Sequence, residues 1–276
     1  NAAGYYVLSD TGNNRIQVFD ELRNLKSTVG VRRHQSGELD EPSDVAVDRT
    51  GRILVANAGS DRVHVFDRHG NFSFTFGSEG EQEGEFDEPG GVAVGPEDSI
   101  VVADTGNHRI QVFDAQGNFV RSFGRRGDDP GEFYYPADVA VDRQGRIYVA
   151  DDGHDRVQVF DAQGELIRAF DSGYCEALGL GAAGQIYVVD ADDEWVRVCS
   201  SKGVLQFEFG SFRDRFRGNY GVAKGVWSSL TSSFPECLDD PRGVVVDTDG
   251  AIIVADRSPN RLHVYRPIVE GHTQPH

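Results

Sequence analysis

Carboxylate and guanidinium side chains recur at one spacing along this chain, and such pairs can carry acid–base chemistry or bind charged ligands. In five places an Asp or Asn is followed five residues later by Arg, and in a sixth place by Trp195. The six starting residues are Asp10, Asn57, Asp104, Asp151, Asp190 and Asp256. A catalytic constellation occurs once in a domain, whereas a contact that holds the fold occurs in every unit. The recurrence therefore favours a structural role over an active site.

The residues between each Asp and its Arg indicate what that role is. Stretches such as TGNN and TGNH predict a tight turn, in which the Asp can accept N–H groups and the Arg can meet the carboxylate with its planar fork. We expect the pair to set this turn and to lock neighbouring units together. Because Trp195 replaces the Arg in the fifth copy, we expect that copy to lose the device and to be irregular.

The spacing of the copies predicts how the chain is organised. The first four copies lie 47 residues apart, and periods of about 20–50 residues are typical of solenoids, propellers and arrays. In the fourth copy, β-branched or aromatic stretches at 139–142, 146–150, 156–160 and 165–170 are separated by turns that contain Gly. They predict four strands, here named a to d, joined as antiparallel hairpins. Six such units predict an all-β fold, a six-bladed β-propeller of four-stranded antiparallel blades.

The repeats also predict the number of strands and the residues that are buried between blades. The first copy starts at strand b and the last one stops after strand c, so the sequence predicts 22 strands. Residues at alternate positions of a strand face the same layer, and valines occupy such positions in strand a. We expect these valines in the cores between blades: Val45, Val47, Val92, Val94, Val139, Val141, Val244 and Val246.

Composition limits the class of protein. With 276 residues, 38% of them apolar, the chain can bury one large core, and we expect a single domain over residues 1–276. No run approaches the roughly 18 apolar residues of a membrane span, and the N-terminus lacks the pattern of a signal peptide. Cys175, Cys199 and Cys237 are too few and too scattered for a disulfide framework or a zinc site. We interpret them as free thiols of a cytoplasmic protein that does not bind membranes. The chain has no Met, even at position 1, which we interpret as an excised or processed piece.

The repeats resemble a known family. The stretches PRGVVVD, IVVADTGNHRIQVFD and GNFVRSFG resemble the NHL repeat, and GEFYYPADVAVD at 131–142 is similar to the matching stretch of the tripartite-motif (TRIM) NHL proteins. The resemblance extends over almost the whole chain. It implies the substrate-recognition end of a ubiquitin ligase, whose catalytic RING lies elsewhere in the full chain. NHL propellers also bind RNA or act as bacterial sensor domains, and more distant relatives are lyases.

Residues for catalysis or metal binding do not form a recognised pattern. The stretches DADDE at 190–194 and DTDG at 247–250 lack the alternating oxygen ligands and distal Glu of a calcium loop. The chain has no nucleophile elbow, phosphate-binding glycine loop or histidine-based triad. We therefore expect no metal, no cofactor and no catalytic activity in this domain.

The loops that join strand d of one blade to strand a of the next, here called d–a loops, differ most between copies. In a propeller these loops and the b–c turns lie on one face, and a repeat scaffold carries its function in such variable loops. Arg and aromatic residues gather there, and we predict a ligand-binding face formed by Arg32, Arg33, Arg125, Arg126, Tyr134, Tyr135, Arg213, Arg215, Arg217 and Tyr220. The longest d–a segment, 211–238, is predicted to be an insertion with a dedicated role.

Two kinds of ligand fit this face. The net charge of −18 disfavours nucleic acid, because affinity for phosphate comes largely from Lys and Arg. Glu79, Glu81, Glu83 and Glu85 in the second d–a loop would also repel phosphate. We therefore expect a protein or peptide ligand, as in the TRIM ligases, and no DNA. The alternative is single-stranded or stem-loop RNA bound by the same Arg and aromatic residues. A sensor domain, extracellular in that case, or a lyase-like or hydrolase-like propeller is a remoter alternative.

Overall fold

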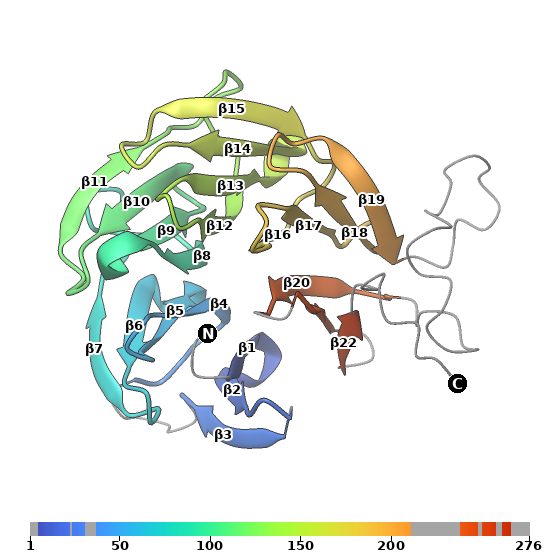
Figure 1. Cartoon of the computed structure of the whole chain (residues 1–276). Helices are drawn as coiled ribbons and strands as arrows, with labels where there is room; N and C mark the ends of the chain where they lie inside the picture. The colour runs from blue at the N-terminus through green and yellow to red at the C-terminus, as the bar shows by residue number, and fades with distance from the viewer. Residues whose placement is uncertain are drawn as a thin grey trace, which may run out of the picture. The chain divides into compact units, whose positions relative to one another are not determined.

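The chain folds into six antiparallel sheets, one for each sequence repeat (Figure 1). The structure, a computed structural model, describes residues 5–22, 24–30, 37–210, 238–247, 250–257 and 261–265. Over these residues it contains 22 strands: the first and last sheets have three and the other four have four. The predicted all-β, six-bladed β-propeller is thereby confirmed. Nothing helical in the described ranges has the length and hydrophobicity that a membrane span requires.

The chain divides into two compact units, and the first, Asn1–Cys175, holds blades 1 to 4. Blade 1 consists of β1 (Tyr6–Asp10), β2 (Arg15–Phe19) and β3 (Leu25–Val29), and blade 2 of β4 (Pro42–Val47), β5 (Ile53–Asn57), β6 (Arg62–Phe66) and β7 (Phe72–Phe76). Blade 3 consists of β8 (Pro89–Val94), β9 (Ile100–Asp104), β10 (Arg109–Phe113) and β11 (Phe119–Phe123), and blade 4 of β12 (Pro136–Val141), β13 (Ile147–Asp151), β14 (Arg156–Phe160) and β15 (Leu166–Asp171). Short 3₁₀ turns lie at η1 (Thr11–Asn13), η2 (Ala58–Ser60), η3 (Pro96–Asp98) and η4 (Asp152–His154).

The second unit, Glu176–His276, holds blades 5 and 6. Blade 5 consists of β16 (Ala177–Leu180), β17 (Ile186–Asp190), β18 (Trp195–Cys199) and β19 (Leu205–Gly210), and blade 6 of β20 (Pro241–Val246), β21 (Ile252–Asp256) and β22 (Arg261–Tyr265). The first blade lacks strand a and the last lacks strand d among the described residues, as the sequence predicts.

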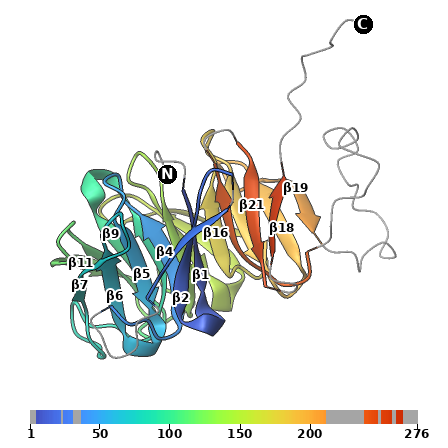
Figure 2. The same ribbon diagram turned by 90° about the horizontal axis from the view of Figure 1, so that it is seen from below.

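Local sequence explains the hairpins. In the c–d turn of blade 3, Asp114 accepts the N–H groups of Gln116 and Asn118, and Gly117 adopts a φ of 82° that closes the turn. Glycine reaches such a φ without the steric cost that a side chain brings. The b–c turns end differently, on a non-glycine residue in the left-handed region, such as Asn14 at 50° and His108 at 54°. Both kinds of turn bring consecutive strands into antiparallel register, and the side view shows them at opposite ends of the blades (Figure 2).

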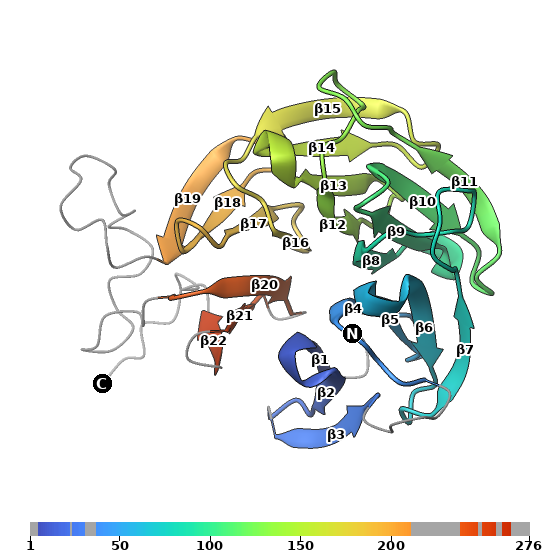
Figure 3. The same ribbon diagram turned by 180° about the vertical axis from the view of Figure 1, so that it is seen from behind.

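The cores lie between neighbouring blades of each unit. In the first unit β4 contacts β8 and β8 contacts β12, with these strands innermost and β7, β11 and β15 outermost (Figure 3). Val92 and Val139 of these inner strands are 3% exposed and lie in the two clusters between blades 2 and 3 and between blades 3 and 4. The other predicted valines, except the half-buried Val47, pack against such clusters while partly buried: Val45, Val94, Val141, Val244 and Val246.

Candidate functional site

The repeated Asp and Arg of blade 3 form a clamp on the incoming d–a loop. Asp104 is fully buried at the end of β9, where its Oδ2 accepts hydrogen bonds from Nε of Arg109 (2.7 Å) and Nε2 of Gln111 (2.9 Å). Its Oδ1 accepts the backbone N–H of Asp87 in the loop (2.8 Å). The terminal nitrogens of Arg109 donate to the loop carbonyls of Glu81, Gln82 and Glu85. Burial raises the pKa of Asp104, and the hydrogen bonds it accepts oppose that rise.

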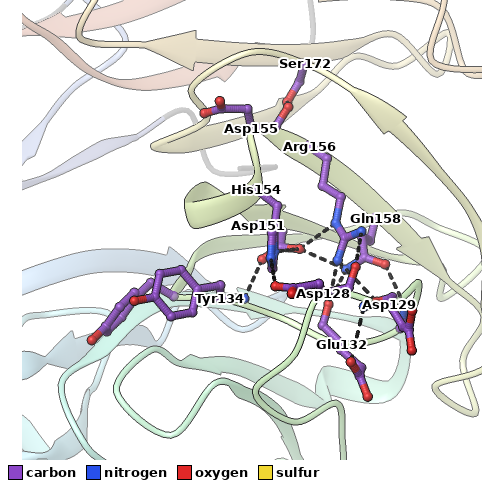
Figure 4. Close-up of polar contacts among 12 residues, drawn as sticks. Asp128, Asp129, Glu132, Tyr134, Asp151, His154, Asp155, Arg156, Gln158 and Ser172 are labelled. Carbon is purple, nitrogen blue, oxygen red and sulfur yellow. Dashed lines mark hydrogen bonds and ion pairs between the residues drawn. The ribbon is translucent and has the colours of Figure 1, made fainter.

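Blade 4 repeats the clamp (Figure 4). Asp151 accepts hydrogen bonds from Nε of Arg156 (2.7 Å), Nε2 of Gln158 (3.0 Å) and the backbone N–H of Tyr134 (2.8 Å). Arg156 donates to the carbonyls of Asp128, Asp129 and Glu132. The donors and acceptors of both clamps are therefore occupied by the protein itself, which supports the structural interpretation of the repeated pair.

The clamps correct one prediction about this pair. The sequence predicts that each Asp accepts N–H groups of its own b–c turn. Asp190 does accept the backbone N–H of Asp193 (2.9 Å), and Asp104 accepts a side-chain N–H of Asn107 (3.1 Å). The backbone N–H that Asp104 and Asp151 accept, however, belongs to a residue 17 positions upstream, in the d–a loop. The cause is tertiary: the carboxylate at the end of strand b faces the loop that enters the same blade. Blade 2 uses Asn57 in the same way, because its Oδ1 accepts the N–H of Asp40 (2.8 Å).

The prediction for the fifth copy is wrong. Blade 5 is a four-stranded sheet, and its Asp190 accepts a hydrogen bond from Nη1 of Arg197 (2.6 Å), two residues beyond Trp195. Side chains two residues apart on a strand share a face, so Arg197 reaches the carboxylate from the position that Gln111 holds in blade 3. Blade 5 therefore retains the Asp–Arg pair, but its Arg lies two residues further along strand c.

A second contact locks each of blades 1 to 3 to the next blade. The left-handed residue of the b–c turn accepts the backbone N–H of the residue that precedes the next strand a. Asn14 Oδ1 accepts from Glu41 (3.0 Å), and Asp61 Oδ1 accepts from Glu88 (2.8 Å). In blade 3 the acceptor is Nδ1 of His108, which accepts the N–H of Tyr135 (3.0 Å). Three different side chains thus supply the same acceptor.

An aromatic group surrounds this last contact, and we call Arg126, Tyr134, Tyr135, His108 and His154 the Tyr134 cluster. The rings of His108 and Tyr134 are stacked, with centroids 5.4 Å apart and an interplanar angle of 5°. The guanidinium of Arg126 lies 5.3 Å from the centroid of Tyr134. Tyr135 meets both rings edge-on and is 43% exposed. No other described d–a loop carries two adjacent aromatic residues.

His154 connects the cluster to the clamp of blade 4 (Figure 4). Its ring lies 5.9 Å from that of Tyr134. Its Nδ1 is 3.0 Å from Oδ2 of Asp151, and its Nε2 is 3.0 Å from Oδ1 of Asp128 in the d–a loop. The loop is thus held by the clamp on one side and borders the Tyr134 cluster on the other.

The structure places four of the ten predicted ligand-binding residues. Arg126, Tyr134 and Tyr135 come together, whereas Arg125 turns to Glu132 and forms an ion pair with it (2.7 Å). The remaining six lie outside the described residues: Arg32, Arg33, Arg213, Arg215, Arg217 and Tyr220. The predicted insertion also lies outside them, apart from Leu238, which is buried.

Sequence reasoning missed His108 and His154. Both replace residues of the b–c turn, His108 at the position of Asn14 and His154 one position earlier, at that of Asn13. A change to His in only one of several copies is the signal that could have identified them. Within the described part of the chain, no three His, Cys, Asp or Glu side chains are arranged to hold a metal ion.

Comparison with known proteins supports the fold and the repeats. A family model described as a 6-bladed beta-propeller matches residues 94–175, and the NHL repeat matches residues 39–66 and 238–265. No curated protein matches the sequence.

Solved structures of similar fold belong to several functional classes. A streptogramin B lyase is 14% identical, with a TM-score of 0.66 over 97% of this chain and 91% of that one. The virginiamycin B lyase of Staphylococcus aureus is 12% identical, with a TM-score of 0.63 over 96% and 77%. The hydrazine synthase of Kuenenia stuttgartiensis is 14% identical, with a TM-score of 0.63 over 95% and 92%. At such identities the likeness concerns the fold alone. Together with the repeat matches, it shows that the chain is a six-bladed β-propeller that carries NHL repeats.

Proposed function

We propose that this propeller is a non-catalytic recognition domain that binds a protein or peptide ligand at the Tyr134 cluster. One observation carries the proposal: the repeated Asp and Arg are bonded within the protein, whereas Arg126 and Tyr135 of the same face are exposed. Exposed Tyr and Arg are the residues that most often anchor protein ligands. NHL propellers generally mediate protein interactions, which agrees with this use of the face.

The surroundings of the cluster favour a particular ligand chemistry. The Arg126 guanidinium can pair with a carboxylate in a bidentate manner while Tyr134 and Tyr135 offer aromatic contact area. Asp128 and Asp129 are exposed in the same loop and would repel a chain of phosphates. A single carboxylate beside an aromatic or aliphatic side chain of a peptide therefore fits better than RNA.

The resemblance of 131–142 to the TRIM-NHL proteins extends the proposal to a biological role. The propeller would capture a substrate protein in the cytoplasm, and a RING domain elsewhere in the full chain would transfer ubiquitin to it. This finer role rests on the resemblance, whereas the binding mode rests on the geometry of the cluster.

A parallel selection from a peptide library and an RNA pool, both at one salt concentration, tests the proposal. We expect peptides to be enriched, and Arg126→Glu to weaken the selected peptide at least about tenfold, the loss of a charge-assisted pair. Arg143→Glu is the matched control, because it reverses the same charge at an exposed position of an a–b turn, at the other end of the blade. Enrichment of RNA that depends on Arg126 would establish the alternative ligand. Equal binding by the wild type and Arg126→Glu would overturn the site.

A further inference from the structure

The lock between blades 3 and 4 differs from the two before it in one chemical property. Asn14 and Asp61 accept a backbone N–H through a side-chain oxygen, whereas His108 accepts it through a ring nitrogen. Asn cannot gain a proton near neutral pH, and an Asp side chain does so only near pH 4. An imidazole does so near pH 6.5. Of the three locks, only that of blade 3 has an acceptor whose ordinary pKa lies in the physiological range.

The hydrogen bond from Tyr135 requires a neutral His108. A neutral imidazole has one acceptor nitrogen and one N–H, but the protonated ring has two donors and no acceptor. With Nδ1 protonated, two N–H groups would face each other across the present 3.0 Å. Tyr135 has a left-handed φ of 55° and is followed by Pro136, so the bond restrains a backbone conformation that is otherwise unfavourable for its residue type.

Charged groups on three neighbouring segments act on the pKa of His108: Arg126, Asp87 and Asp151. Burial lowers its pKa, and the Arg126 guanidinium of the following d–a loop lowers it further. Asp87 of the preceding loop and Asp151 of blade 4 act in the opposite direction, but the pKa stays below its ordinary value. The ring is 7% exposed and stacks on Tyr134, which in turn lies beside His154. The lock is thus closed at neutral pH and opens on acidification.

His154 holds the other part of this loop. Both of its ring nitrogens lie 3.0 Å from carboxylate oxygens, of Asp151 and of Asp128. The loop between β11 and β12 is therefore tied to the b–c turn of blade 3 through Tyr135 and to that of blade 4 through Asp128.

We infer that His108 is a proton-operated lock that makes ligand binding at the Tyr134 cluster depend on pH. Its neutral ring holds the Tyr135 backbone and the stacked Tyr134 in the conformation that presents them, and protonation releases Tyr135 and repels Arg126. The inference rests on the proposed function for its ligand. The lock itself can be tested without any ligand.

Amide hydrogen exchange followed by NMR between pH 7.5 and 5 provides that test. Protection of the Tyr135 amide, corrected for the intrinsic exchange rate, is compared with that of Glu41 and Glu88, which the locks of Asn14 and Asp61 hold in the same protein. We expect Tyr135 alone to lose protection on acidification, by up to about tenfold per pH unit below the pKa of His108. Parallel behaviour of the three amides would overturn the inference.

His108→Asn supplies the matched variant, since it places in blade 3 the residue that blade 1 has at this position. We expect the ratio of Tyr135 protection to Glu41 protection to become independent of pH in this variant. In a second arm, the affinity of a selected peptide should fall with acid for the wild type and not for His108→Asn. The selected peptide could bind wild type equally at both pH values while protection of the Tyr135 amide still depends on pH. That result would contradict the effect of His108 on binding but support the pH-dependent hydrogen bond itself. Failure to select any peptide bears on the proposed function alone.

Discussion

Blades 2 and 3 differ in the residue at the end of strand b. In blade 3 it is Asp104, which is bonded to Arg109 and Gln111. In blade 2 it is Asn57, and the positions of Arg109 and Gln111 are taken by the exposed Arg62 and the buried His64. Both Asp104 and Asn57 accept the backbone N–H of the incoming d–a loop. The shared requirement is thus an acceptor oxygen at this place. The negative charge of Asp104 has a second effect, because it binds Arg109, which donates hydrogen bonds to the carbonyl groups of the loop.

The comparison also separates structural residues from binding residues. The clamp recurs with different chemistry, since blade 6 pairs Asp256 with His263 (3.0 Å) and blade 5 pairs Asp190 with Arg197. The Tyr134 cluster has no counterpart in the other described d–a loops. The clamp occurs in several blades with different partner residues, as expected of a contact that stabilises the fold. The Tyr134 cluster occurs in one blade, as expected of a site that binds a ligand.

The largest expected effect is the loss of the carboxylate in blade 3. Asp104→Ala leaves the charged Arg109, Gln111 and the N–H of Asp87 without their acceptor in a buried place. We expect a loss of about 3–5 kcal/mol in the free energy of unfolding, the cost of breaking a buried charged pair. Asn57→Ala in blade 2 removes a neutral acceptor and should cost about 1–3 kcal/mol. Urea denaturation of the two variants measures the difference, and equal losses would contradict the separate role of the charge.

Blade 2 should instead show a pH effect through His64. Burial, reinforced by Arg62, lowers the pKa of His64 to about 4 from 6.5, and its ring nitrogens have no hydrogen-bond partner among the described residues. The folded state therefore holds the ring neutral. Its contribution to stability is fully present above pH 6.5 and is lost as the pH falls from 6.5 to about 4, by about 3 kcal/mol in all.

His64→Gln tests this effect, because Gln is the residue at the same position in blades 3 and 4. We expect the variant to lose less stability between pH 7 and pH 4.5 than the wild type does, as measured by urea denaturation at each pH. An unchanged pH profile would show that His64 does not contribute to acid sensitivity.

A smaller contrast is expected at the two arginines. Arg109→Ala leaves Asp104 and the loop carbonyls without a donor and should cost about 1–3 kcal/mol. Arg62 is exposed beside the neutral Asn57, and Arg62→Ala should cost less than about 0.5 kcal/mol. Thermal or urea unfolding measures both. A larger loss at Arg62 than at Arg109 would reverse our assignment of the clamp to charge pairing with Asp.

Much of this fold could be predicted from the sequence because its determinants are local. Turns such as DAQG carry their own Asp acceptor and left-handed Gly, so the hairpins and strand ends follow from short stretches. The partner of Asp104 could not be predicted, because the N–H of Asp87 is brought to it only by the closing of the d–a loop. The pairing of Asp190 with Arg197 in blade 5 could have been predicted, since side chains two residues apart on a strand share a face.

The candidate site was predicted less completely. The sequence could predict three residues of the cluster, because the loops that differ between copies carry the function of a repeat protein. These are Arg126, Tyr134 and Tyr135. Arg125 was indistinguishable from Arg126 in sequence, and only the ion pair with Glu132 separates the two. The part played by His108 depends on a left-handed φ and on the N–H of the next blade, which no spacing in the sequence reveals.

The most direct test of the division between clamp and cluster is the affinity of folded Arg109→Ala for the selected peptide, measured well below its melting temperature. Arg109 lies in the clamp of blade 3 and Arg126 lies over Tyr134, so the two variants separate the roles. We predict that Arg109→Ala, although less stable, binds within about twofold of the wild type, whereas the stable Arg126→Glu loses at least about tenfold in affinity. A folded Arg109→Ala variant that no longer binds the peptide would contradict the account and assign the repeated Asp and Arg to the binding site.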